Sequence, residues 1–153
     1  DMNVHVYDPK IHQLPDEVVG YKKLEDMLSA VDIVTLHLPL NTDTYGIIGH
    51  EEIGICPIGT YLINTSRGDL VETDALLRAL EIGHLSGAAL DVISNERDNM
   101  SSEKKVLVEY ANKHDNLILT PHLGGATIES MEKTEIFMAK KLVSWVEDGM
   151  LVQ

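Results

Sequence analysis

The chain has 153 residues, enough for one domain with its own hydrophobic core. It carries 12 Lys and Arg residues against 25 Asp and Glu residues, and this net charge of -13 would repel phosphate backbones, so we expect no nucleic-acid partner. The lone cysteine cannot form an internal disulfide, and the start does not resemble a signal peptide, so we expect a cytoplasmic protein. No apolar run approaches the roughly 18 residues of a membrane span, so we expect no membrane partner.

Short apolar runs and amphipathic stretches alternate along the chain. In chain order they predict a strand over residues 4–7, a helix over 24–28, strands over 33–38 and 61–63, a helix over 73–80, a strand over 86–90, a helix over 104–114, a strand over 117–119 and a long helix over about 127–146. We expect Thr73 to cap the start of the helix over 73–80 and Gly83 to stop it, and Thr127 resembles a helix start.

This alternation predicts an α/β fold, a Rossmann-like doubly wound parallel sheet with helices on both faces. In such sheets ligands bind beyond the carboxyl ends of the strands. The residues that could carry chemistry follow the predicted strands, so we expect them at that edge of the sheet.

Asp8 directly follows the first predicted strand and precedes Pro9. A carboxylate in this place can accept hydrogen bonds from both hydroxyls of an adenosine ribose, and it would repel the 2′-phosphate of NADP. The alternative is a turn, because Asp-Pro is a common turn dipeptide.

Arg67 follows the strand over 61–63 within the sequence Asn64-Thr65-Ser66-Arg67-Gly68. A guanidinium there could bind a substrate carboxylate through two hydrogen bonds, and Gly68 would permit a tight turn. The alternative for Arg67 is an ordinary surface ion pair.

Acidic and imidazole side chains follow the last two strands. Asp91 could accept from a nicotinamide carboxamide, and Glu96 could orient a histidine, although isolated loop carboxylates are often merely solvated. His122 lies in Pro121-His122-Leu123-Gly124-Gly125 before the long helix, and an imidazole can give and take a proton near neutral pH. The alternative is a bystander histidine. No cluster with metal-ligand spacing is evident, so we expect no metal.

The order and spacing of these motifs resemble the D-isomer-specific 2-hydroxyacid dehydrogenases. The resemblance runs from Asp8 to the last helix, and residues 64–71 are its most specific stretch. It implies that Arg67, Glu96 and His122 are the catalytic residues and that NAD is the cofactor. The implied cofactor-binding residues are Asp8, His37, Leu38, Pro39, Thr42, Thr65, Ser66, Arg67, Asp91, His122, Gly124 and Gly125.

The chain departs from the family pattern in two respects. The Gly-x-Gly-x-x-Gly loop that would hold the cofactor pyrophosphate is absent from the 153 residues, so we expect it upstream of Asp1 and a sheet that is incomplete at its N-terminal end. Glu96 is followed by Arg97, where the family usually has Pro, and the segment from Glu96 to His122 looks longer than usual.

The resemblance implies an NAD-dependent oxidoreductase that moves a hydride between a nicotinamide and a D-2-hydroxy or 2-oxo acid. Residues 1–126 would be a partial NAD-binding domain, and residues 127–153 a helix leading back toward a substrate domain. We expect the intact protein to be a homodimer and the isolated chain to be inactive. Residues 41–55 are a candidate for the subunit contact, with Tyr45, Ile47, Ile48 and Ile53 as its apolar residues. The alternatives are an NAD-sensing binding module resembling a co-repressor, and an inactive truncated remnant.

Overall fold

The computed structural model describes residues 2–11, 13–95, 101–125 and 127–147. The chain forms two compact units, Asp1–Thr120 and Pro121–Gln153. All the described strands and the first four α-helices belong to the first unit, and the long helix α5 belongs to the second. The division of the sequence into residues 1–126 and 127–153 stays a prediction.

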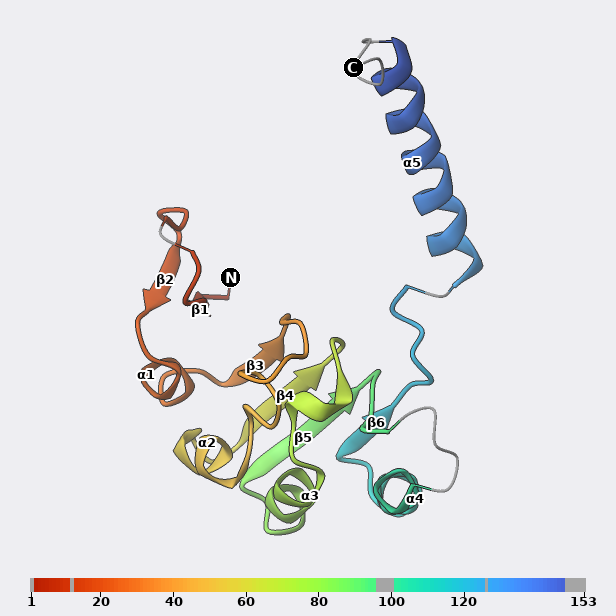
Figure 1. The fold of residues 1–153 in the computed structure, drawn as a ribbon. Coiled ribbons are helices and arrows are strands. Elements are labelled where there is room, and N and C mark those ends of the chain that lie inside the picture. The colour runs from red at the N-terminus through yellow and green to blue at the C-terminus, as the bar shows by residue number, and fades with distance from the viewer. Residues whose placement is uncertain (1, 12, 96–100, 126, 148–153) are drawn as a thin grey trace. The chain divides into compact units, whose positions relative to one another are not determined.

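The strands form two parallel sheets (Figure 1). The larger sheet has the order β3-β4-β5-β6, and its strands are β3 (Ile33–Leu36), β4 (Thr60–Asn64), β5 (Leu85–Leu90) and β6 (Leu117–Leu119). The smaller sheet pairs β1 (Val4–Tyr7) with β2 (Val18–Tyr21), in register from Val4 opposite Val18. All pairings are parallel, which confirms the predicted α/β class.

In the described residues, five α-helices and one short 3₁₀ helix accompany the strands. They are α1 (Leu24–Leu28), α2 (His50–Ile55), the 3₁₀ helix η1 (Gly68–Leu70), α3 (Thr73–Glu81), α4 (Ser102–Ala111) and α5 (Ile128–Glu147). The sequence pattern predicted four of the α-helices and missed α2, whose six residues are too few to show a clear helical period. It also missed β2.

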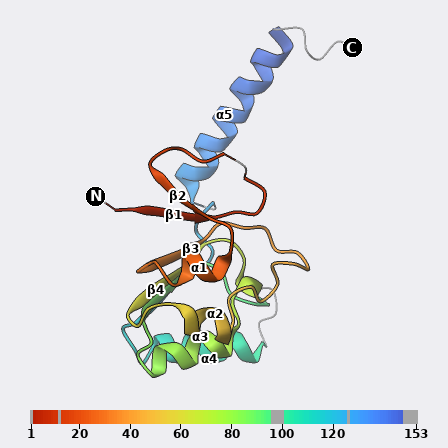
Figure 2. The ribbon, with the colours of Figure 1, turned by 90° about the vertical axis from the view of Figure 1, so that its left-hand side faces the viewer.

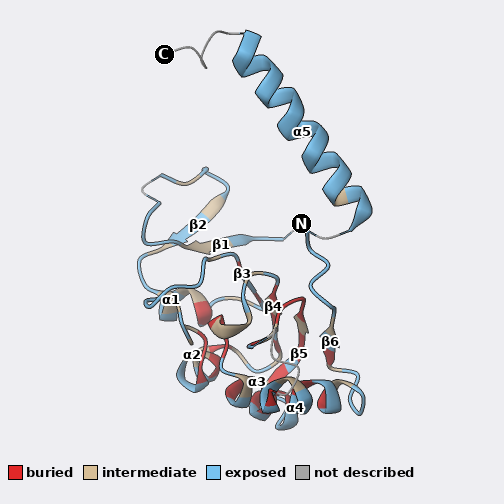
Figure 3. Ribbon diagram, turned by 45° about the vertical axis from the view of Figure 1, so that its right-hand side comes forward, coloured by how far each residue is buried: buried red, intermediate tan, exposed pale blue. Residues whose placement is uncertain are grey.

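Burial alternates along the strands of the larger sheet, because successive side chains point to opposite faces. Val34, Leu62 and Leu117 are buried in one core with apolar residues of α2, α3 and α4, which Figure 2 shows on the same side of the sheet. Ile33 and Tyr61, which are register partners, lie on the other face and are about half exposed. We expected helices on both faces of the sheet. Within Asp1–Thr120 the described helices cover one face of the larger sheet, as the burial colours of Figure 3 illustrate.

The ends of two helices test the predicted capping residues. Thr73 is the first residue of α3 rather than its N-cap, because Glu72 occupies the cap position in an extended conformation and donates its backbone N–H to Ile48 at 3.0 Å. Gly83 follows the end of α3 with a φ of 71°, the left-handed conformation that a helix stop favours. Thr127 accepts the Ser130 amide at 3.1 Å, which confirms it as a helix start.

The predicted subunit contact over residues 41–55 is partly wrong. Ile48 and Ile53 are only 3% and 4% exposed, because they belong to the core of their own chain. An isolated parallel bridge pairs Ile48 with Val71 and draws the segment inward. Tyr45, in contrast, is 70% exposed.

The 20-residue helix α5 contains no buried residue and carries charged side chains along its length. Among the described helices, none combines the length and the hydrophobicity that crossing a bilayer requires.

Candidate functional site

An open hollow of about 500 Å³ lies beyond the carboxyl ends of β3 and β4. Two loops line it, one following each strand. Its lining residues are His37, Leu38, Pro39, Leu40, Thr65, Ser66 and Arg67. All of these except Leu40 were predicted as site residues from the sequence. The parallel direction of the two strands brings their loops to one edge of the sheet.

Asn64, the last residue of β4, shapes the loop that carries Arg67. Its side chain is 1% exposed, donates from Nδ2 to the Arg67 carbonyl at 2.8 Å, and accepts the Ser66 amide on Oδ1 at 3.0 Å. The Ser66 hydroxyl donates to the Leu36 carbonyl at 2.7 Å and so ties this loop to the end of β3. The loop that lines the hollow is therefore held by partly buried hydrogen bonds, which limit its freedom.

Gly68 has a different role from the one its sequence suggests. Its φ does not lie in the left-handed region, but a Cβ atom here would lie only 1.9 Å from the carbonyl carbon of Ile93 and 2.2 Å from the amide nitrogen of Ser94. The predicted tight turn is present as the 3₁₀ helix that begins at Gly68, but the glycine is needed because the loop after β5 packs directly against the backbone after β4.

Arg67 is exposed at the rim of the hollow. One guanidinium nitrogen donates to the Ser66 carbonyl at 2.6 Å, which leaves its other donors available to a ligand. Among the described residues that line the hollow, Arg67 alone carries a permanent positive charge. The arrangement can bind an anionic group, and a carboxylate matches the planar guanidinium best.

Asp91 lies at the carboxyl end of β5, the next strand of the sheet. It is 8% exposed, and its Oδ1 accepts the Thr120 hydroxyl at 2.5 Å. Thr120 follows β6 and donates its own amide to the Leu90 carbonyl at 3.0 Å. Sequence reasoning missed Thr120 as a partner of Asp91, although its place after the neighbouring strand and before Pro121 was a usable signal.

Like Asp91, two further predicted cofactor residues of the first unit lie outside the lining of the hollow. Asp8 follows β1, is exposed, and accepts the Lys10 amide at 2.8 Å, so the turn considered from the sequence is present while the carboxylate still reaches solvent. Thr42 is exposed in a turn held by Asn41, whose Oδ1 accepts the amides of Asp43 and Thr44 at 2.8 and 3.1 Å.

The remaining predicted residues belong to the second unit or lie outside the described residues. His122, Gly124 and Gly125 are in Pro121–Gln153, and their placement with Arg67 stays a prediction. His122 has a φ of 55°, a left-handed conformation uncommon for a residue with a side chain. Glu96 lies outside the described residues, so its predicted contact with His122 stays a prediction as well.

Comparison with known proteins identifies relatives of this chain. The family described as D-isomer specific 2-hydroxyacid dehydrogenase, NAD binding domain, matches residues 1–124. D-3-phosphoglycerate dehydrogenase of Escherichia coli K12 is 38% identical over 150 residues, which are 97% of this chain and 35% of that protein. D-specific alpha-keto acid dehydrogenase of Enterococcus faecium is 43% identical over 122 residues, covering 76% of this chain and 38% of that protein.

Solved structures resemble the fold as well. D-lactate dehydrogenase from Aquifex aeolicus, complexed with NAD and lactic acid, superposes with a TM-score of 0.79 at 31% identity. The match covers 97% of this chain and 47% of the other. The chain thus spans less than half the length of these relatives, and the similarity is to their nucleotide-binding part.

Proposed function

Because the chain belongs to the NAD-binding domain family of the D-isomer-specific 2-hydroxyacid dehydrogenases, we propose that it forms the cofactor side of an active site that interconverts a D-2-hydroxy acid and its 2-oxo acid. The observation that carries this proposal is the open hollow with Arg67 at its rim, at the carboxyl ends of parallel strands. In parallel α/β sheets this edge is where ligands bind.

The residues present fit an NAD molecule at this edge. The exposed Asp8 carboxylate after β1 would accept the ribose hydroxyls. Asp91 would accept from the carboxamide, and its burial in a hydrogen bond with Thr120 would hold the carboxylate in one orientation. His37, Thr65 and the other lining residues would contact the cofactor in the hollow. The 153 residues contain no Gly-x-Gly-x-x-Gly motif, so we expect tight NAD binding only where such a motif is supplied.

The chemistry needs a bound carboxylate and a mobile proton. Arg67 would bind the carboxylate of the acid and polarise its carbonyl through charge-assisted hydrogen bonds. His122, when protonated, would donate a proton to the oxygen of the 2-oxo acid and take it back in the reverse direction. Glu96 would favour the charged imidazole if it lies beside it. When bound, NAD supplies or accepts the hydride.

The role of Arg67 is tested in the whole protein that carries this sequence. We expect Arg67→Ala to lower kcat/KM for the 2-oxo acid about a hundredfold or more, since each hydrogen bond to a charged group contributes roughly 1.5–3 kcal/mol. The matched control is Arg78→Ala, because Arg78 is an exposed arginine on α3 that pairs with Glu81 at 3.8 Å.

Unchanged kcat/KM in Arg67→Ala would overturn the substrate-binding role. Loss of activity in His122→Ala is expected of the proton donor. Full turnover by His122→Ala would overturn that role.

We also propose that the whole protein is a cytoplasmic homodimer. In a twofold dimer one surface must meet itself, and the exposed Tyr45 is the large apolar residue that the 41–55 segment leaves free for such a contact. Light scattering at micromolar concentration tests this, and a monomer would refute it.

A further inference from the structure

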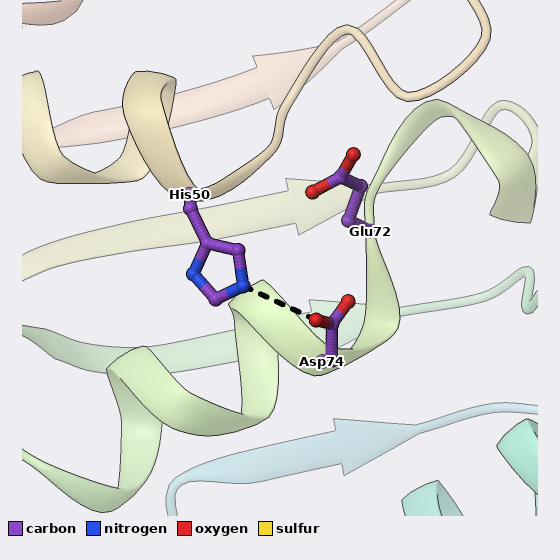
Figure 4. A group of neighbouring side chains, drawn as sticks. All are labelled: His50, Glu72 and Asp74. Atoms are coloured by element: carbon purple, nitrogen blue, oxygen red, sulfur yellow. Dashed lines mark hydrogen bonds and ion pairs between the residues drawn. The ribbon is translucent and has the colours of Figure 1, made fainter.

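Three side chains that could bind a metal ion meet on the surface of the first unit. His50 begins α2, Glu72 directly precedes α3, and Asp74 is in the first turn of α3. Figure 4 shows His50 and Asp74 joined by their hydrogen bond, with the Glu72 side chain beside them. One ligand atom from each, an imidazole nitrogen and two carboxylate oxygens, lies within 4.8 Å of the others. None of the three residues lines the hollow described above.

Backbone hydrogen bonds hold together the two segments that carry these side chains. Ile48 donates to the Leu70 carbonyl and accepts the Glu72 amide, both at 3.0 Å, so the start of α2 is fixed against the start of α3. Gly46 adds a third such bond, to the Asp69 carbonyl at 2.8 Å. The ligand set is therefore carried by two segments that a ladder of backbone bonds keeps together.

Glu72 occupies a space that only glycine leaves open. A Cβ atom at Gly49 would lie 2.7 Å from one Glu72 carboxylate oxygen and 2.9 Å from its carboxyl carbon. The Glu72 carboxylate is thus packed against the backbone of Gly49, the residue that precedes His50. This contact limits the rotation of the Glu72 side chain beside the start of α2.

Two of the three ligand atoms are near the spacing that a metal needs, and the third, on Glu72, lies within 4.8 Å of both. His50 Nε2 and Asp74 Oδ2 are 3.1 Å apart, and ligand atoms at about 2.0–2.2 Å from a tetrahedral Zn²⁺ would be about 3.3–3.6 Å apart, so this pair would have to open by a few tenths of an ångström. In the described part of the chain, no lysine or arginine forms an ion pair with Glu72 or Asp74, so two negative charges face one imidazole. The His50 and Asp74 side chains are 60% and 81% exposed, which gives an ion and its remaining water ligands free access.

We propose that His50, Glu72 and Asp74 form a surface site for a divalent transition-metal ion such as Zn²⁺. One nitrogen and two carboxylate oxygens suit Zn²⁺ better than Mg²⁺, which prefers an all-oxygen octahedron. The ion takes the place of the proton between His50 and Asp74, with the imidazole proton then on Nδ1. By joining the starts of α2 and α3, the ion stabilises the folded state.

The test is calorimetric titration of the whole protein that carries this sequence with ZnCl₂ and, separately, MgCl₂. We expect one Zn²⁺ equivalent that is lost or weakened at least about tenfold in His50→Gln, Glu72→Gln and Asp74→Asn, since even outer-shell changes cost metal sites about 10–100-fold. Mg²⁺ should bind more weakly. His114→Gln is the matched control, because His114 is an exposed histidine stacked on Tyr110 in another part of the unit.

A second readout separates binding from folding. Zn²⁺ should raise the melting temperature of the parent protein and of His114→Gln, but not of His50→Gln or Asp74→Asn. If the parent takes up no Zn²⁺, or if all variants bind it as the parent does, the proposal is overturned and the cluster is only a hydrogen-bonded link between two helix starts. Both outcomes are independent of dehydrogenase activity.

Discussion

Substitution of Gly68 by alanine tests how the site is built. The new Cβ would lie 1.9 Å from the carbonyl carbon of Ile93, whereas ordinary carbon contacts begin near 3.4 Å, so one loop must move by about 1.5 Å. The clash is with backbone, which cannot rotate away as a side chain can. Overpacking of this kind costs about 1–3 kcal/mol, and we expect the upper end of that range.

The assay is urea unfolding followed by circular dichroism. With a slope of about 1–3 kcal/mol per molar urea, a loss of about 3 kcal/mol lowers the midpoint by about 1 M or more. Gly54→Ala is the matched control, because a Cβ there meets nothing within 4 Å and alanine in a helix gains about 0.5–1 kcal/mol over glycine. A Gly68→Ala midpoint equal to that of the parent would refute the close-approach argument.

Four further predictions concern individual side chains. Asp8→Ser should raise kcat/KM with NADP relative to NAD in the whole protein, because the carboxylate that repels a 2′-phosphate is gone; an unchanged ratio counts against Asp8 as the ribose ligand. Thr120→Val should weaken NAD binding by about 1–3 kcal/mol in calorimetry while Thr120→Ser retains it, because only valine removes the hydrogen bond to Asp91; equal affinities would contradict this. The hydrogen bond from His50 lowers the pKa of Asp74 below its usual 3.8. The ionised Asp74 therefore stabilises the folded state above pH 3.8, and this contribution is lost as the pH falls through the lowered pKa. Asp74→Asn should flatten the acid limb of the stability curve, measured by urea unfolding between pH 2 and 6. Burial raises the pKa of the Cys56 thiol above 9.0, so the folded state loses stability as the pH rises beyond that value. Because the thiol is buried, a thiol reagent at pH 8 should label Cys56 only as fast as the protein unfolds.

The sequence by itself determined the alternation of strands and helices and the edge where the site lies. Parallel strands bring whatever follows them to one side of the sheet, so the pattern of apolar runs was sufficient to expect Arg67 at that edge, whereas the family resemblance added His37, Thr65 and Ser66. The family followed from the spacing of the same motifs, and the match over residues 1–124 confirms it.

Other features depend on contacts between segments that are distant in the sequence. Ile48 and Ile53 were expected as apolar contacts of a subunit interface, but both belong to the core of their own chain, and a bridge to Val71 holds Ile48 there. The space that requires Gly68 is set by the loop after β5, about 25 residues later.

The cluster of His50, Glu72 and Asp74 belongs to this second kind as well. His50 and Asp74 are 24 residues apart, and no local pattern joins them. Periodicity reports which face of an element is apolar, whereas only packing decides which elements meet. That is why the edge of the sheet was predictable from the sequence, and why the side chains that meet between helix starts became visible only in the folded chain.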